Sequence, residues 1–393
     1  MLIPLGLLLM TQGPGDSISL GEALARARAV RGQVTVAAAQ VAEARAALRS
    51  AGAITNPTVS YSHSGAVPQE HFLFDQPLDF LLRRGPERSA ARARIAGAQA
   101  DSGLTMANLA REVRTAFYRA LAAAGQEELV AAQAGQADSV ARIAAARLRA
   151  GDVSLLEQEQ AAQEAARVRQ TLSAAREAAR VAEAALARAI AWAGAEPPRA
   201  VGALDAGLAE PPPGLPLPDS LPAVRTAVAE SASTAALARS ASLTRIPLPT
   251  VLGGAEWNDP SQPGTLAVLG FAVPLPLWQR GGGPAAEAAA RARRAAALAG
   301  ETRLESVRAL REAQIRLTES SRRARFARDS LLPQAAVLRA RAVRAYQAGE
   351  TGILPVLDAL RSEREVALAA VQDQLAYQEA LADWYALLGR VDE

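Results

Sequence analysis

Few side chains in this sequence have the chemistry of a reactive centre. The chain contains no cysteine, and its only two imidazoles belong to His63 and His71, which could approach each other across one hairpin. Without a clear third ligand, two histidines are more typical of lining or loop residues than of a metal site. Neither a Ser-His-Asp order nor a nucleophile elbow is present. The residues therefore predict no enzyme, no metal centre and no cofactor.

Two further patterns with chemical meaning also have plainer explanations. Residues 280–287, RGGGPAAE, place glycines between a predicted strand and a helix, but the Gly-Lys-Ser/Thr of a phosphate loop is missing. Carboxylate pairs at helical spacing sit among arginines and indicate surface pairing. The net charge of +3 comes from 43 basic and 40 acidic residues. Because neither half of the chain carries a concentrated basic field, nucleic acid is not an expected partner.

Two Gly-acid pairs interrupt long helical runs and stand out from the rest of the chain. Gly151-Asp152 lies in RLRAGDVSLLEQEQ, and Gly349-Glu350 lies in AYQAGETGILPVLDAL. A helix that ends in a tight reversal favours glycine, because glycine adopts positive φ without strain. Both pairs are therefore predicted to be the tips of helical hairpins.

The elements that position these tips are long. A helix is predicted over 19–53 with Ser17 or Ser19 as its cap, followed by strands at 58–63 and 71–78. A helix then runs from about Pro86 to Arg149, which at ~1.5 Å per residue is roughly 95 Å long. Half of the residues are apolar but only 4% are aromatic. Alanine accounts for much of the apolar fraction, which predicts that helices pack closely through small side chains.

The same order of elements occurs twice. The first repeat ends with a helix over 154–193, and a Pro-rich linker follows it. The order then starts again with a helix at 219–244 and strands at 249–257 and 265–275. A long helix to Ala348, with a kink at Pro333, and a helix at 353–388 complete it. FDQPLDFLLRRG from Phe74 also matches FAVPLPLWQRGG from Phe271. We infer an internal duplication, with repeats at 17–193 and 219–393, a linker at 194–218, and β-hairpins at 56–80 and 248–278.

The four strand-like runs cannot close a membrane barrel alone, because the smallest such barrels have about eight strands. Either they form a small soluble sheet, or several copies pool their strands, and three copies would supply twelve. Aromatic residues gather in or beside these runs, where a membrane barrel places its interfacial girdle: Tyr61, Phe72, Phe74, Phe80, Trp257, Phe271 and Trp278.

The N-terminal segment 1–16 contains LIPLGLLLM, which is too short to span a bilayer and is placed like the apolar core of an export signal. It lacks a preceding basic residue and a clear cleavage site. We interpret it as a truncated or atypical signal, the alternative being merely an apolar N-terminus. Nowhere else do ~18 apolar residues follow one another, so no transmembrane helix is predicted.

The duplicated order, the Pro-Leu strand ends, the two turn phrases and LLPQA at 331–335 together resemble the TolC-type outer-membrane efflux proteins. The shorter chain and linker resemble the branch that serves cobalt-zinc-cadmium resistance pumps. The resemblance implies a mainly α fold with a small β part: a homotrimer in which long antiparallel coiled-coil helices form an α-barrel, and four strands per chain enter a shared 12-stranded transmembrane β-barrel. It also implies an outer-membrane location with a long periplasmic extension.

By the same resemblance, the protein is a passive exit duct that meets a periplasmic adaptor and, through the adaptor, an inner-membrane pump. The adaptor-docking tip then comprises Arg147, Leu148, Gly151, Asp152, Val153, Ser154, Tyr346, Gly349, Glu350, Thr351 and Gly352. Asp358, with Glu157 as its loose counterpart, occupies the position of a pore-gate acid, where a carboxylate ring restricts ion traffic. The alternative for both acids is a solvated helix face. The rival classes are a periplasmic adaptor and a coiled-coil scaffold without a barrel.

Overall fold

The computed structural model describes residues 17–205, 207–208, 214–278 and 281–391. The predicted export signal at 1–16 and part of the predicted linker lie outside these residues. The chain divides into two units: unit 1 takes Met1–Val34, Thr105–Pro216 and Arg308–Glu393, and unit 2 takes Thr35–Leu104 and Leu217–Val307. Each unit therefore draws on both of the repeats inferred from the sequence.

The first helical run begins with a well-defined cap. The hydroxyl of Ser19 accepts from the backbone N–H of Glu22, and the Glu22 carboxylate accepts from the backbone N–H of Ser19 at 2.8 Å, which is a capping box. Ser19, not Ser17, is thus the cap of α1 (Leu20–Val30). The single helix predicted over 19–53 is wrong, because the backbone of Arg31 is extended and α2 (Gly32–Ser50) starts after it. The Arg31 guanidinium instead bonds the carboxylate of Glu112 at 3.1 Å.

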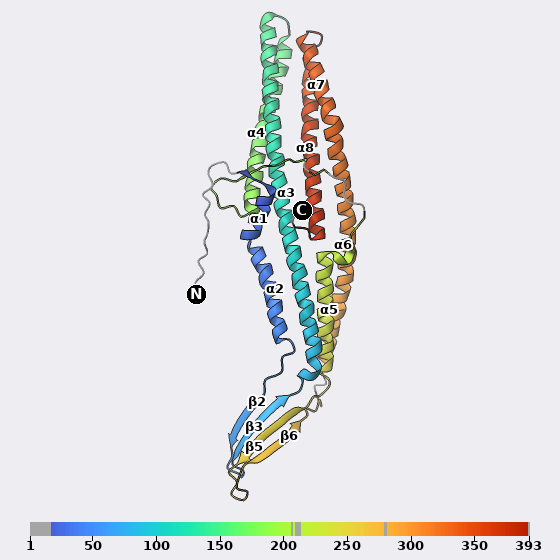
Figure 1. Cartoon of the computed structure of the whole chain (residues 1–393). Coiled ribbons are helices and arrows are strands. Elements are labelled where there is room, and N and C mark those ends of the chain that lie inside the picture. Colours follow the sequence, from blue (N-terminus) through green and yellow to red (C-terminus); the bar gives the residue numbers. More distant parts are fainter. Residues whose placement is uncertain (1–16, 206, 209–213, 279–280, 392–393) are drawn as a thin grey trace. The chain divides into compact units, whose positions relative to one another are not determined.

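The long helices follow the predicted order. In the first repeat they are α3 (Phe80–Ala150) and α4 (Leu155–Ala189), and in the second they are α5 (Pro222–Leu243), α6 (Gly282–Phe326), α7 (Leu332–Gln347) and α8 (Leu354–Leu388) (Figure 1). A short 3₁₀ turn, η1 (Pro218–Ser220), precedes α5. The start predicted for α3 at Pro86 is too late, because Pro86 removes only one backbone N–H and is accommodated inside the helix.

Pro333 also disturbs its helix without ending it. The predicted kink corresponds to a π-helical turn, η2 (Ala327–Leu331), placed directly before α7. Pro333 has no N–H to offer the carbonyl one turn earlier, and a wider turn accommodates that missing bond. Among the described residues, no helix combines the length and the apolarity that crossing a membrane would require.

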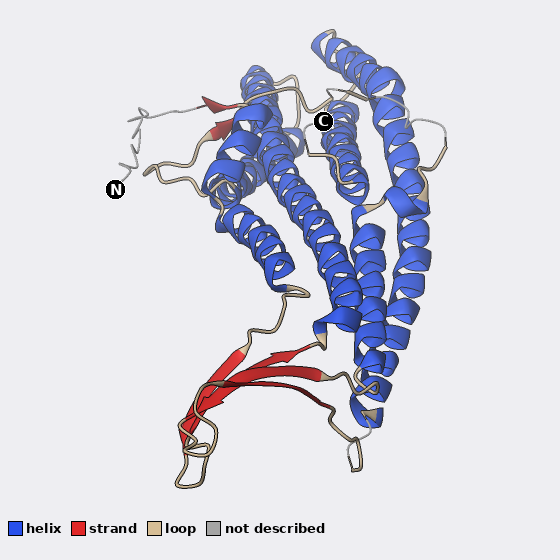
Figure 2. Ribbon diagram, turned by 60° about the horizontal axis from the view of Figure 1, so that its bottom comes forward, coloured by secondary structure: helices blue, strands red, loops and turns tan. Residues whose placement is uncertain are grey.

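The strands form two sheets. Four antiparallel strands, drawn in red in Figure 2 and labelled in Figure 1, lie in the order β2 (Thr58–His63), β3 (Glu70–Pro77), β5 (Thr250–Trp257) and β6 (Leu266–Ala272). The central pairing, of β3 with β5, therefore joins the two repeats. The predicted strands agree with these bounds to within a few residues. A second, parallel pair consists of β1 (Ser17–Ile18) and β4 (Arg199–Ala200), which ties the start of the described chain to the linker.

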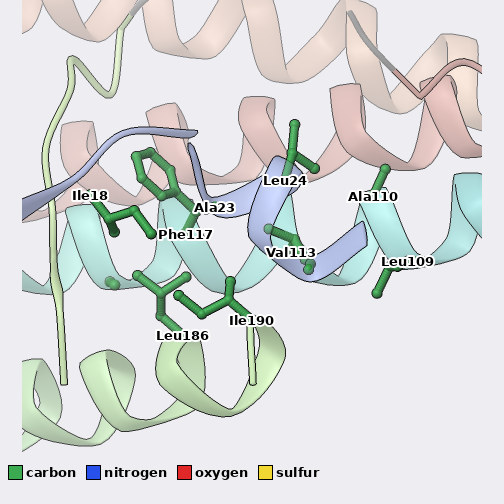
Figure 3. Packing of buried hydrophobic residues seen from close by; sticks show 11 residues of the cluster. Ile18, Ala23, Leu24, Leu109, Ala110, Val113, Phe117, Leu186 and Ile190 are labelled. Atoms are coloured by element: carbon green, nitrogen blue, oxygen red, sulfur yellow. The ribbon is translucent and has the colours of Figure 1, made fainter. Parts of the chain in front are cut away.

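Unit 1 has a core built where three helices meet. Leu24 from α1, Val113 and Phe117 from α3, and Leu186 from α4 are buried against one another beside Ile190 (Figure 3). Alanine supplies more than half of the buried hydrophobic positions among the described residues. Helices can approach closely where side chains are this small, so the core agrees with the packing that the composition predicts.

Candidate functional site: two helix turns and an amphipathic sheet

The two Gly-acid pairs adopt the same backbone geometry. Gly151 has a φ of 84° and Gly349 a φ of 76°. After α3 the N–H of Asp152 donates to the carbonyl of Arg147 at 2.9 Å, and after α7 the N–H of Glu350 donates to the carbonyl of Ala345 at 2.9 Å. The N–H of each glycine also donates to the backbone carbonyl three residues earlier, which completes a Schellman motif in both repeats. Both turns end their helices at the predicted residues.

The two turns contact each other inside unit 1. The guanidinium of Arg147 donates to the backbone carbonyl of Tyr346 at 3.2 Å and lies over the Tyr346 ring, 4.9 Å from its centroid. A cation above an aromatic face is attracted by the ring quadrupole. The carboxylate of Glu157 lies beside Gly352, 3.7 Å from where a Cβ would stand. First-repeat side chains therefore hold the second-repeat turn in place.

The predicted tip residues differ in exposure. Those with exposed side chains or backbone are Gly151, Asp152, Ser154, Gly349, Glu350, Thr351 and Gly352, whereas Arg147, Leu148 and Val153 are half-buried. Tyr346 is buried, at 3% exposure, in a cluster with Ile353 and Leu357. Tyr346 thus supports the tip from inside and does not present its ring on the surface.

The two predicted gate acids also differ. The side chain of Asp358 is 72% exposed, pairs with Arg361 at 3.4 Å, and lines a groove of about 460 Å³ between α7 and α8. The backbone N–H of Glu157 donates to the hydroxyl of Ser154, which caps α4. Glu157 stands in the first turn of that helix, where a negative charge is favourable.

A buried carboxylate that the sequence analysis missed joins α4 to α8. Glu164 is 2% exposed and accepts from the Arg361 guanidinium at 2.8 and 2.9 Å and from Arg364 at 3.1 Å. Burial alone raises the pKa of Glu164, but the hydrogen bonds from both arginines outweigh burial and hold its pKa below the ordinary value. The two arginines lie 197 and 200 residues further along the chain, which is close to the spacing between equivalent residues of the two repeats. The internal duplication was therefore the sequence signal that could have indicated this contact.

The four-stranded sheet of unit 2 has two unlike faces. Side chains of residues that stand directly opposite each other on neighbouring strands point to the same side of the sheet. The register therefore places the following pairs on one face: Val59 and Phe74, Tyr61 and Phe72, and Val251 and Phe271. These side chains are exposed, and the neighbouring Leu269 on the same face is 86% exposed. The opposite face carries the following polar side chains: Thr58, Ser60, Ser62, His71, Asp75, Thr250 and Glu256.

Five of the seven predicted interfacial aromatics lie on the apolar face: Tyr61, Phe72, Phe74, Trp257 and Phe271. The rings of Tyr61 and Trp257 are stacked with centroids 6.4 Å apart. The other two lie beside the strands. Phe80 is the first residue of α3, and Trp278 follows β6 with 90% exposure.

The two histidines do not approach each other across the hairpin, which corrects one expectation. His63 pairs in register with Glu70, and Ser62 is the residue opposite His71, so the two imidazoles point to opposite faces. His63 Nδ1 lies 2.9 Å from Glu70, whereas His71 Nδ1 lies 3.0 Å from Glu256 on β5. Each imidazole thus has a carboxylate partner of its own.

These features define a class of protein: paired helical hairpins with glycine turns, combined with an antiparallel sheet that exposes an apolar face. Residues 22–191 match the model of the Outer membrane efflux protein family. The chain is 30% identical over 280 residues to the cobalt-zinc-cadmium resistance protein CzcC of Cupriavidus metallidurans. That alignment spans 70% of this chain and 64% of the relative.

Solved structures have the same fold. The crystal structure of CusC gives a TM-score of 0.79 at 17% identity, over 97% of this chain and 96% of CusC. The outer membrane protein VceC of Vibrio cholerae gives 0.75 at 19% identity, over 95% of this chain and 97% of VceC. The chain belongs to the outer membrane efflux protein family. This confirms the predicted family, the outer-membrane location and the mainly α fold with a small β part.

The Glu164 contacts generate a prediction about stability. Glu164→Gln leaves two arginines without their anion and should destabilise the protein by about 2 kcal/mol. The pKa of Glu164 is lowered on folding, so its contribution is full above the unfolded pKa of about 4.3 and is lost as pH falls through the folded value. Thermal unfolding in detergent, followed by circular dichroism at several pH values, measures both effects.

The matched control is Glu312→Gln, which removes an exposed ion pair with Arg316 within α6. Exposed pairs contribute little, so this variant should stay within about 0.5 kcal/mol of the wild type. Equal stability of the Glu164 and Glu312 variants would contradict the role assigned to Glu164.

Proposed function

We propose that three copies of this chain form the outer-membrane exit duct of a tripartite efflux system. The duct conducts solutes passively, and an inner-membrane pump supplies the energy through a periplasmic adaptor. Family membership supports this proposal, since proteins of the family are channels rather than enzymes and work as trimers with adaptor and pump partners.

One observation carries the proposal: an exposed apolar face on a sheet that has two free edges. In lipid every backbone N–H and C=O must find a partner, so a sheet of four strands cannot enter a membrane while β2 and β6 remain edges. Neighbouring strands alternate in direction. The β6 edge of one copy can therefore pair antiparallel with the β2 edge of the next, and three copies in head-to-tail order close a twelve-stranded barrel.

The polar face of the sheet suits the inside of such a barrel. Membrane barrels alternate apolar residues toward lipid with polar residues toward the lumen. The register of β2, β3 and β5 largely follows that alternation. The aromatic side chains lie on one face, together with His63 and Glu70, and the other face carries Ser60, Ser62, His71, Asp75 and Glu256. A periplasmic adaptor or a coiled-coil scaffold has no need for a sheet of this kind.

The two turns suit the adaptor-docking end. Their exposed Gly-acid pairs stand on helices held together by Arg147 and Glu164. Asp358 is exposed near the second turn and fits a gate acid whose charge acts on passing ions. Glu157, near the first turn, would be a second gate acid. The name of the Cupriavidus metallidurans relative favours metal cations as the exported solutes.

Charge placed on the two faces of β6 tests the barrel. Leu269→Arg puts a cation on the apolar face, which costs about 2–4 kcal/mol at the middle of a bilayer. Its neighbour Val268 points to the polar face, so Val268→Arg is the matched control. The first variant should be lost from outer-membrane fractions while the second remains. Equal retention of both variants would contradict the assignment of the faces.

The docking turns are tested through their glycines. Gly151→Val and Gly349→Val place a β-branched side chain at positive φ, which costs about 1–2 kcal/mol or more and distorts the turn. Both should reduce chemical cross-linking to the adaptor and leave the trimer intact. Gly135→Val, at an exposed position inside α3, is the control. Unchanged cross-linking in both tip variants would remove the turns from the docking surface.

The gate is tested through conductance. Asp358→Ala removes the exposed carboxylate and should raise the single-channel conductance of the protein in planar bilayers. Glu319→Ala, an exposed acid paired with Arg322 on α6, should leave conductance unchanged. A conductance of the Asp358 variant equal to that of the wild type would exclude Asp358 from the gate.

A further inference from the structure

The polar face of the four-stranded sheet is acidic. It carries Asp75 and Glu256, and none of the residues in β2, β3, β5 and β6 is an arginine or lysine. A face with carboxylates and no basic side chain attracts cations and repels anions. His71 is the one side chain on this face that also offers nitrogen to a metal ion.

His71 and Glu256 are paired across the junction between the two repeats. They stand directly opposite each other in the β3–β5 register, with His71 Nδ1 3.0 Å from Glu256 Oε1. Each side chain is about a quarter exposed, so both are held in place yet open to solvent. Because an ionised carboxylate only accepts, Nδ1 carries the hydrogen in this contact, and in the neutral imidazole the Nε2 lone pair is free to bind an ion.

At many metal sites a carboxylate accepts one ring N–H of a histidine in this way, while the other ring nitrogen binds the ion. The Nε2 nitrogen of a histidine is a ligand for divalent transition metals such as Zn²⁺ and Co²⁺, and Glu256, which contacts Nδ1 on the other side of the ring, orients that ligand.

We propose that His71, oriented by Glu256, is a contact site for divalent transition-metal ions on the polar face of the sheet. The site offers few protein ligands, and the described residues contain no group of three or more His, Cys, Asp or Glu side chains that could hold an ion. Water fills the remaining positions, so the ion exchanges quickly, as a passage requires. Only the placement of this face toward a lumen rests on the proposed function.

His63 and Glu70 provide a built-in comparison. They form the same kind of pair, at 2.9 Å, but on the apolar face. Glu70 is also engaged by the hydroxyl of Tyr61, which donates to its other oxygen at 2.5 Å. The apolar side chains around this pair favour lipid or detergent over a hydrated cation.

Titration of the purified full-length protein in detergent with ZnCl₂, followed by calorimetry, tests the proposal. The wild type should show a weak class of Zn²⁺ sites. His71→Ala and Glu256→Gln should each weaken Zn²⁺ binding by about tenfold or more, in the range seen when metal ligands and their partners are altered. His63→Ala and Glu70→Gln should bind as the wild type does. Glu256→Gln keeps the side-chain shape, so it covers the case in which His71→Ala does not fold.

Absence of Zn²⁺ binding by the wild type would overturn the proposal, as would equal losses in the two pairs of variants. Zn²⁺ binding that depends on His71, in a protein that conducts no ions in planar bilayers, would support the site and count against the duct. Ion conductance without Zn²⁺ binding would leave the duct standing and remove the site.

Discussion

The pairing of β3 with β5 is the interaction on which the rest of the sheet depends. It joins strands that lie about 180 residues apart in sequence into one sheet, over the register from Glu70 with Trp257 to Pro77 with Thr250. If the pairing of β3 with β5 shifted by one residue, the apolar face of the β2–β3 hairpin would lie on the same side as the polar face of the β5–β6 hairpin. The exposed aromatic face, the acidic polar face and the contact between His71 and Glu256 all follow from that register.

The helical part is held across the repeats by a different kind of interaction. Glu164 from the first repeat is buried between Arg361 and Arg364 from the second, and Arg147 covers Tyr346 near the turns. A buried carboxylate without its cations is costly, so Glu164 disfavours any arrangement of α4 and α8 that separates it from both arginines. Arg361 also reaches Asp358, which links the proposed gate acid to this buried contact.

The sequence predicted much of this architecture because its strongest signals are local. The two glycine turns, the strand pairs and the repeated order of elements depend on residues close in the chain, and the structure has all of them. The break at Arg31 was not predicted, and the contact that Arg31 makes there is with Glu112 on another helix. Neither was the Glu164 cluster, whose partners belong to the other repeat. The separation of His63 and His71 follows from a register that residue types alone did not define.

The central claim is that copies of this chain close one barrel through the edges β2 and β6. The chain has no cysteine, so a cysteine placed in β2 together with one in β6, scanned along both strands, reports only on this contact. Oxidation in outer membranes should produce covalent trimers for the pairs that come into register, because each copy bonds two neighbours. Monomers at every tested pair would contradict the account.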